Sequence, residues 1–188
     1  MKRCGVVPRS LDVILPERSA AAQRLGDKWH LDEVVLTING QKHWLWHAVD
    51  QDGFVLDALV QSRRDKRAAE RLMRKLIRKQ ARSPRVLITD KLKSYGAARR
   101  SLGLKMEHRQ HKGLNNHAEN SHQPTQRRER IMKQFKSARH VQRFVSIHDP
   151  ITNLFHFPRH EMTAAEYRTL RSEAMTIWVK LAAVSSAA

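Results

Sequence analysis

The stretch WHLDEVVLTINGQKHWLWHAVDQDGFVLDALVQ, residues 29–61, contains three β-rich runs separated by two short polar pairs. The pairs are Asn39-Gly40 and Asp52-Gly53, and both are strong signals for a tight hairpin turn. Because each turn leaves only a few residues between runs, consecutive runs must pair with one another. The stretch therefore predicts a meander of three antiparallel strands.

The residues that follow predict a helix, a strand, a second helix and a weaker fifth strand. Apolar residues recur at helical spacing through residues 65–82, and Ser83-Pro84 ends that pattern. PRVLITD, residues 84–90, is a short continuous apolar run, as expected for a parallel strand buried on both faces. A helix at 91–102 and a weak strand at 104–109 complete an α/β domain with a mixed five-stranded sheet.

Helices are expected in the rest of the chain. Residues 137–157 have a helical pattern with an interruption at Asp149-Pro150. A last helix begins near Thr163, where Thr163 and Glu166 have the spacing of a capping box. We therefore divide the chain into an irregular arm (1–24), a core domain (25–160) and a C-terminal helix (161–188).

The charge of the chain points to a polyanionic partner. Its 188 residues carry a formal charge of +18, with a pI near 11.0. So much uncompensated charge favours nucleic acid binding over the other classes of partner. No apolar stretch approaches the roughly 20 residues that span a bilayer, and Cys4, the single cysteine, excludes a disulfide framework. The expected location is the bacterial cytoplasm, at the nucleoid.

Three carboxylates are notable by position. Asp32 lies inside an otherwise apolar predicted strand, where an unpaired charge is costly. Asp90 follows the buried run at its carboxyl end, where ligand sites of open α/β sheets collect. Glu119 opens a strongly basic, mostly helical stretch. If the first and fourth strands are neighbours, Asp32 and Asp90 would face each other, and a helix at that edge could add Glu119.

Grouped carboxylates repel one another and are best tolerated around hard divalent cations with oxygen ligands. Two magnesium ions roughly 3.5–4 Å apart can support an in-line phosphoryl displacement. Each acid also has a structural interpretation. Asp32 could pair with an arginine, Asp90 could cap the following helix, and Glu119 could complement a helix dipole. The spacing of the three acids leaves both interpretations open.

Three segments together carry a family resemblance: WHLDEV, LITDKLKSYG and EHRQHKGLNNHAENSHQPTQRRER. They resemble, in the same order, the catalytic core of bacterial insertion-sequence transposases of the DDE type. The similarity covers about residues 24–182. It implies a ribonuclease H-like fold of the integrase type, with a mixed five-stranded sheet flanked by helices and followed by C-terminal helices.

The resemblance also implies an activity and a site. Asp32, Asp90 and Glu119 would be the catalytic triad and would bind two Mg²⁺ ions, with Mn²⁺ as a possible substitute. Such enzymes cleave a strand at the end of the element and join it to target DNA. The implied partners are terminal inverted repeats and target DNA, with a homo-oligomer assembled on them. The residues expected to contact DNA are Lys91, Lys93, Arg109, Lys112, Asn116, Arg127, Arg128 and Arg130.

The chain departs from the family pattern in two places that matter for function. Only about two dozen residues precede the core, so we expect it to lack the N-terminal helix-turn-helix of the family. Gln126 stands where the family has Lys or Arg seven residues after the glutamate. The alternative hypothesis is therefore a truncated, catalytically silent remnant that binds DNA and modulates an intact transposase. The alternating charges of residues 63–82 are typical of the solvated face of an amphipathic helix.

Overall fold

The structure is a computed structural model, and it describes residues 26–111, 127, 129, 135–157 and 162–186. These residues belong to two compact units, one ending at Ser146 and one starting at Ile147. The first unit contains the sheet, together with Asp32, Glu33 and Asp90.

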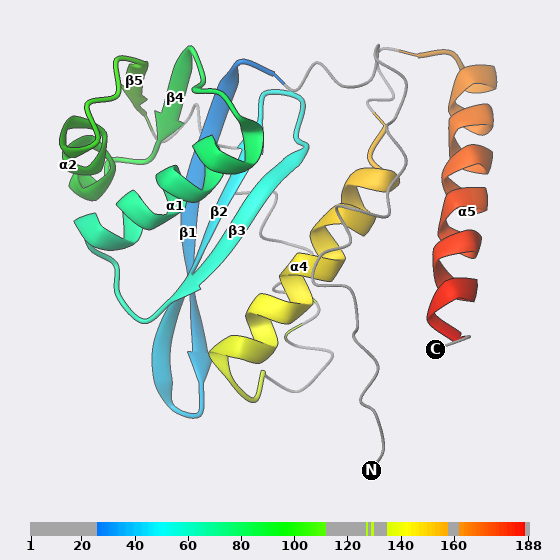
Figure 1. Ribbon diagram of the computed structural model, residues 1–188, viewed down its shortest axis with the longest axis horizontal. Helices are drawn as coiled ribbons and strands as arrows, with labels where there is room; N and C mark the ends of the chain where they lie inside the picture. The colour runs from blue at the N-terminus through cyan, green and yellow to red at the C-terminus, as the bar shows by residue number, and fades with distance from the viewer. Residues whose placement is uncertain (1–25, 112–126, 128, 130–134, 158–161, 187–188) are drawn as a thin grey trace. The chain divides into compact units, whose positions relative to one another are not determined.

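The first unit is built on a mixed five-stranded sheet with strand order β3-β2-β1-β4-β5 (Figure 1). The strands are β1 (Lys28–Ile38), β2 (Gln41–Asp50), β3 (Val55–Gln61), β4 (Val86–Thr89) and β5 (Glu107–Gln110). The first three form the predicted antiparallel meander, and β4 and β5 add to it in parallel with β1. Asn39 and Gly40 make the first turn with positive φ values of 50° and 75°, as a tight hairpin requires. The predicted sheet is confirmed.

Two helices, α1 (Lys66–Gln80) and α2 (Lys93–Ser101), pack together on one face of the sheet (Figure 1). The Asp65 carboxylate caps α1 by accepting a hydrogen bond from the Ala68 amide over 2.8 Å. The apolar stripe of α1 packs against the odd-numbered residues at the start of β1, because alternate residues of a strand face opposite sides. The core formed there includes Trp29, Leu31, Trp46, Leu72, Leu76 and Tyr95.

The opposite face of the sheet is covered by the beginning of α4 (Ala138–Leu154). Val141 and Val145 are buried there with Phe135, against the halves of β1 and β2 that lie next to their hairpin turn. Gln142 also fixes the helix to β3, because its side-chain amide accepts from the Val60 amide and donates to the Ala58 carbonyl. A helix on each face buries both sides of the central strands.

The prediction of an interruption at Asp149-Pro150 is wrong, because α4 continues through Pro150 to Leu154. Proline has a φ value that suits a helix, and here it costs one backbone hydrogen bond without ending the helix.

In the second unit, α5 (Ala164–Ser186) begins with the predicted capping box. Glu166 Oε2 accepts from the Thr163 amide over 2.8 Å, and Thr163 Oγ1 accepts from the Glu166 amide over 3.3 Å. None of the described helices is long and apolar enough to cross a bilayer.

Candidate active site

The pairing of β1 with β4 brings two aspartates together. The two strands are parallel, and the last paired residues are Leu31 on β1 and Thr89 on β4. Asp32 and Asp90 are the next residues along each strand. Because parallel strands run in the same direction, the two residues lie at the same level of the sheet, at the carboxyl end of β4. We call this place the β1–β4 edge of the sheet. The predicted proximity of Asp32 and Asp90 is confirmed.

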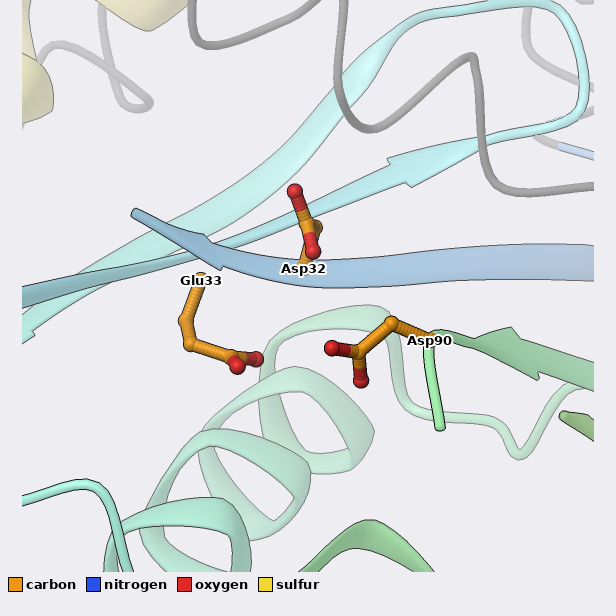
Figure 2. A group of neighbouring side chains, drawn as sticks. All are labelled: Asp32, Glu33 and Asp90. Atoms are coloured by element: carbon orange, nitrogen blue, oxygen red, sulfur yellow. The ribbon is translucent and has the colours of Figure 1, made fainter. Parts of the chain in front are cut away.

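A third carboxylate, Glu33, joins this pair. Each of Asp32, Glu33 and Asp90 offers a carboxylate oxygen, and these oxygens all lie within 4.8 Å of one another. Figure 2 shows Asp32 and Glu33 leaving β1 on opposite sides, with the Asp90 carboxylate turned toward that of Glu33. Three carboxylates this close have the oxygen donors that a hard divalent cation such as Mg²⁺ prefers.

Glu33 is the most deeply buried acid of the three. Its side chain has no exposed surface, and its Oε2 accepts a hydrogen bond from the Tyr95 hydroxyl over 2.6 Å. Burial raises the pKa of Glu33 to about 7, although the hydrogen bond from Tyr95 and the pairing with Arg64 act in the opposite direction. Tyr95 is itself completely buried on α2, and burial raises its pKa well above 10. Glu33 is therefore anchored to the helical side of the sheet.

Arg64 connects Glu33 to Asp90. Its Nε donates to Glu33 Oε1 over 2.6 Å, and its terminal nitrogen lies 3.5 Å from Asp90 Oδ2. The guanidinium also lies over the Trp44 ring, 5.2 Å from the ring centroid. One cation is thus placed between two carboxylates and against an aromatic face, and it offsets part of their mutual repulsion.

The backbone after β4 fixes Asp90 from its other side. Asp90 Oδ1 accepts a hydrogen bond from the Leu92 amide over 2.9 Å, just before α2 begins. The structural interpretation of Asp90 as a residue that organises the start of the next helix is thus partly correct. That bond engages one oxygen, so it is compatible with a place in the acidic cluster.

His108 on β5 contacts the strand that carries Asp90. Its Nε2 lies 2.9 Å from the hydroxyl oxygen of Thr89. Burial, together with Arg99 and Arg100 nearby, lowers the pKa of His108 below its ordinary value. The lowered pKa favours the neutral imidazole, which contacts the end of β4.

Glu33, Arg64 and Tyr95 were not predicted from the sequence as residues of the site. Glu33 could have been noticed, because strand alternation places it on the same side as Trp29 and Leu31, where a carboxylate must find partners. Arg64 and Tyr95 lie 31 and 62 residues from Glu33 along the chain. Their contact with Glu33 depends on how α1 and α2 pack, which no local pattern reveals.

The residues expected to contact DNA are only partly described. Lys91, Lys93, Arg109 and Arg127 are exposed, as a DNA contact requires. Arg109 also forms an ion pair with Glu107 over 2.7 Å, so part of its charge is already compensated. Five of the expected site residues lie outside the described residues: Lys112, Asn116, Glu119, Arg128 and Arg130. The same is true of Gln126.

A family model described as a DDE domain matches residues 26–157. That segment is most of the chain, and it contains both aspartates of the β1–β4 edge and Glu119. The chain belongs to the DDE transposase family of insertion sequences. The expected resemblance is confirmed.

Relatives of this DDE-family chain include transposases of Staphylococcus aureus. The transposase for insertion sequence-like element IS431mec is 36% identical over 67 residues, which cover 36% of this chain and 30% of that protein. The transposase for insertion sequence element IS257 in transposon Tn4003 matches equally well. An uncharacterized protein of Yersinia pseudotuberculosis is 33% identical over 72 residues, or 37% of this chain and 67% of that protein. The matched segment thus spans less than a third of either staphylococcal transposase.

The fold of the DDE-family chain is also found among solved structures. A chain of the simian T-cell lymphotropic virus intasome, solved in complex with PP2A regulatory subunit B56 gamma, aligns with a TM-score of 0.51 and 16% identity. The alignment covers 74% of this chain and 51% of that one. At this identity the likeness concerns the fold alone, and it confirms the predicted ribonuclease H-like, integrase-type architecture.

Proposed function

We propose that the chain is a DNA transposase that catalyses metal-dependent DNA strand cleavage and strand transfer of an insertion sequence. The observation that carries this proposal is the register of β1 and β4, which places Asp32 and Asp90 together at one edge of the sheet. The chain belongs to the DDE family, and by the family resemblance Asp32 and Asp90 would be two of the three acids of the catalytic triad. The formal charge of +18 supports DNA as the substrate.

The donor set at this edge fits a divalent cation. Asp32 and Asp90 would hold Mg²⁺ through carboxylate oxygens, and Glu119 would complete the set according to the family pattern. A bound pair of such ions would activate the attacking oxygen and stabilise the negative charge that develops on the departing oxygen of a phosphodiester. Glu33 is less suited than Asp90 to act as a ligand, because its side chain has no exposed surface and both of its oxygens accept hydrogen bonds of 2.6 Å.

The remaining residues of the site would position the acids and the DNA. Arg64, held by Glu33, would keep the Asp90 carboxylate oriented toward the edge of the sheet. Lys91 and Lys93 directly follow Asp90 and are exposed, so they are placed to contact phosphates beside the scissile bond. Arg109 and Arg127 would add further contacts, and a homo-oligomer would pair two DNA ends.

A nicking assay tests this proposal without knowledge of the terminal repeats. Conversion of supercoiled plasmid to nicked circles is followed with Mg²⁺ or Mn²⁺ for the wild type and for Asp32→Asn, Asp90→Asn and Glu119→Gln. The control is Asp27→Asn, an exposed aspartate that is paired with Arg85. We expect each of the three variants to lose at least a hundredfold in rate, and the control to be unchanged.

Nicking by the three variants at the wild-type rate would overturn the proposed mechanism. A wild-type chain that binds DNA but never nicks it in either metal would instead support the silent, DNA-binding remnant. The wild-type result thus separates the two hypotheses, and the variants test the proposed mechanism.

A further inference from the structure

The outer face of α1 carries a row of arginines. Arg67, Arg71, Arg74 and Arg78 follow one another along α1 at intervals of three or four residues, which is the spacing of one side of a helix. Arg63 and Arg82 flank the helix, and we call these six exposed residues the arginine stripe. Within α1, Arg67, Arg74 and Arg78 lie opposite the side on which Leu72 and Leu76 enter the core. The stripe therefore faces away from the sheet.

This part of the chain holds a large share of the total charge. Residues 63–85 contain eleven Lys and Arg residues against Asp65 and Glu70, a formal charge of +9. That is half of the +18 carried by the whole chain. Polar residues of either sign can solvate a helix face, whereas an excess of one sign this large repels itself and favours an oppositely charged partner.

Within α1, the protein neutralises the charge of the stripe only in part. Glu70 lies 3.5 Å from Lys66 and 3.9 Å from Arg74, and Arg71 donates to the Gln61 side chain over 3.0 Å. In the part of the chain that the structure describes, no carboxylate lies within ion-pair distance of Arg67 or Arg78. Like charges at this spacing destabilise a helix by a few tenths of a kcal/mol per pair, unless an anion compensates them.

We propose that the arginine stripe is a second DNA-binding surface that follows the phosphates of one strand of duplex DNA. From Arg67 to Arg78 the helix extends about 16 Å, a length over which each strand of a duplex carries roughly five phosphates. Arginine suits this partner, because its planar guanidinium can donate two hydrogen bonds to one phosphate. The inference rests on the proposed function in taking DNA as the substrate.

The position of the stripe relates it to the acidic cluster. Arg64, the neighbour of Arg63 in the chain, is the residue that contacts Glu33 and Asp90. The stripe therefore starts beside the acids and continues along α1 away from them. Lys91 and Lys93 lie on the other chain segment that leaves this edge of the sheet. The DNA bound by the stripe would thus be held in addition to the contacts made after Asp90.

The test is the salt dependence of DNA binding by the full chain in EDTA, where no strand chemistry occurs. Binding of a 30-base-pair duplex is measured by fluorescence anisotropy over a series of NaCl concentrations. The variant R67Q/R74Q/R78Q removes three charges from the stripe. The matched control R168Q/R171Q/K180Q removes three exposed charges from α5.

We expect the slope of log K against log salt to become shallower by about 2 to 3 for the stripe variant, because each phosphate contact contributes about 0.9. The control should keep the wild-type slope. Equal slopes for the stripe variant and the control would overturn the inference while leaving the proposed function intact. Stripe-dependent binding to a duplex RNA but not to DNA would also overturn it, whereas loss of nicking by Asp32→Asn tests the proposed function independently.

Folding of the variants is checked by thermal denaturation. The stripe variant should melt at the wild-type temperature or slightly above it, since like charges are removed from an exposed helix face. A weakened slope with an unchanged melting temperature would assign the loss to DNA contacts. A variant that melts earlier is replaced by R67K/R74K/R78K, which keeps the charge and should restore most of the slope.

Discussion

Arg64 and Glu33 form a hydrogen-bonded ion pair, with Arg64 Nε 2.6 Å from Glu33 Oε1, at the edge of the sheet where β1 and β4 part. The second oxygen of Glu33 is occupied by the Tyr95 hydroxyl. Glu33 is thus held by groups from two different parts of the chain, and through Arg64 it reaches Asp90. The ion pair therefore holds the Glu33 carboxylate in place and offsets part of the negative charge of the acidic cluster.

Replacing Arg64 with Gln should destabilise the protein at pH 8. The change leaves the ionised Glu33 carboxylate buried without its cation, which typically costs 3–5 kcal/mol for a fully buried pair. Because the Arg64 side chain is 38% exposed, we expect a smaller cost of about 2 kcal/mol. Urea denaturation measures it, and Arg63→Gln, the neighbouring exposed arginine, should change stability by less than about 0.5 kcal/mol.

The double variant Arg64→Gln/Glu33→Gln completes this test. With no charge left to compensate, it should recover a good part of the stability that Arg64→Gln loses. If the two single losses simply add in the double variant, the two side chains do not interact, and the described ion pair is incorrect.

The stability of the protein should depend on pH through Glu33. Its pKa is raised to about 7 in the folded protein, against an ordinary value of 4.5, so the folded chain binds the proton more tightly than the unfolded chain. The free energy of unfolding due to this group therefore falls as the pH rises from about 4.5 to about 7, and is constant above. The wild type should lose up to about 3 kcal/mol relative to Glu33→Gln over this range.

Urea denaturation of both proteins in EDTA, at half-unit intervals from pH 5 to pH 8, measures this difference. Parallel curves for the wild type and Glu33→Gln would show that the carboxyl group titrates at its ordinary value. The ion pair with Arg64 should also weaken below pH 7, because Glu33 is then protonated.

Tyr95→Phe should destabilise the protein without altering its packing. The change removes one hydroxyl and leaves Glu33 Oε2 buried without its donor, which costs about 1–3 kcal/mol. It should also raise the pKa of Glu33 further, because the hydrogen bond from Tyr95 lowers it. Tyr167→Phe, at the other tyrosine, which is partly exposed, is the control. A Tyr95→Phe variant as stable as the wild type would exclude a stabilising role for the Tyr95 hydroxyl.

The fold could be predicted from the sequence because local sequence patterns indicate its strands, helices and turns. Turn pairs such as Asn39-Gly40 separate the strands of the meander, and a continuous apolar run marks β4. The position of Asp90 at the end of that run predicted its proximity to Asp32 on the condition that the first and fourth strands are neighbours, which the structure confirms. Pro150 shows the limit of such rules, because proline discourages a helix without always ending one.

The residues that form hydrogen bonds with the acids could not be predicted from local patterns. Arg64 reaches Glu33 because α1 begins close to the end of β4, and Tyr95 reaches it because α2 packs beside α1. These contacts join residues that are far apart in the chain, and they depend on side-chain packing. A sequence pattern can predict that a carboxylate in a strand is buried, but it cannot identify the hydrogen-bond donors that pair with that carboxylate.

The most direct test of the central claim, that Asp32 and Asp90 together hold a divalent cation, is a calorimetric titration with Mn²⁺ at pH 8. Asp32→Asn and Asp90→Asn should each bind Mn²⁺ at least tenfold more weakly than the wild type. Glu33→Gln should lose less than either, and Asp27→Asn should bind as the wild type does. Wild-type affinity in Asp32→Asn or Asp90→Asn would contradict the claim.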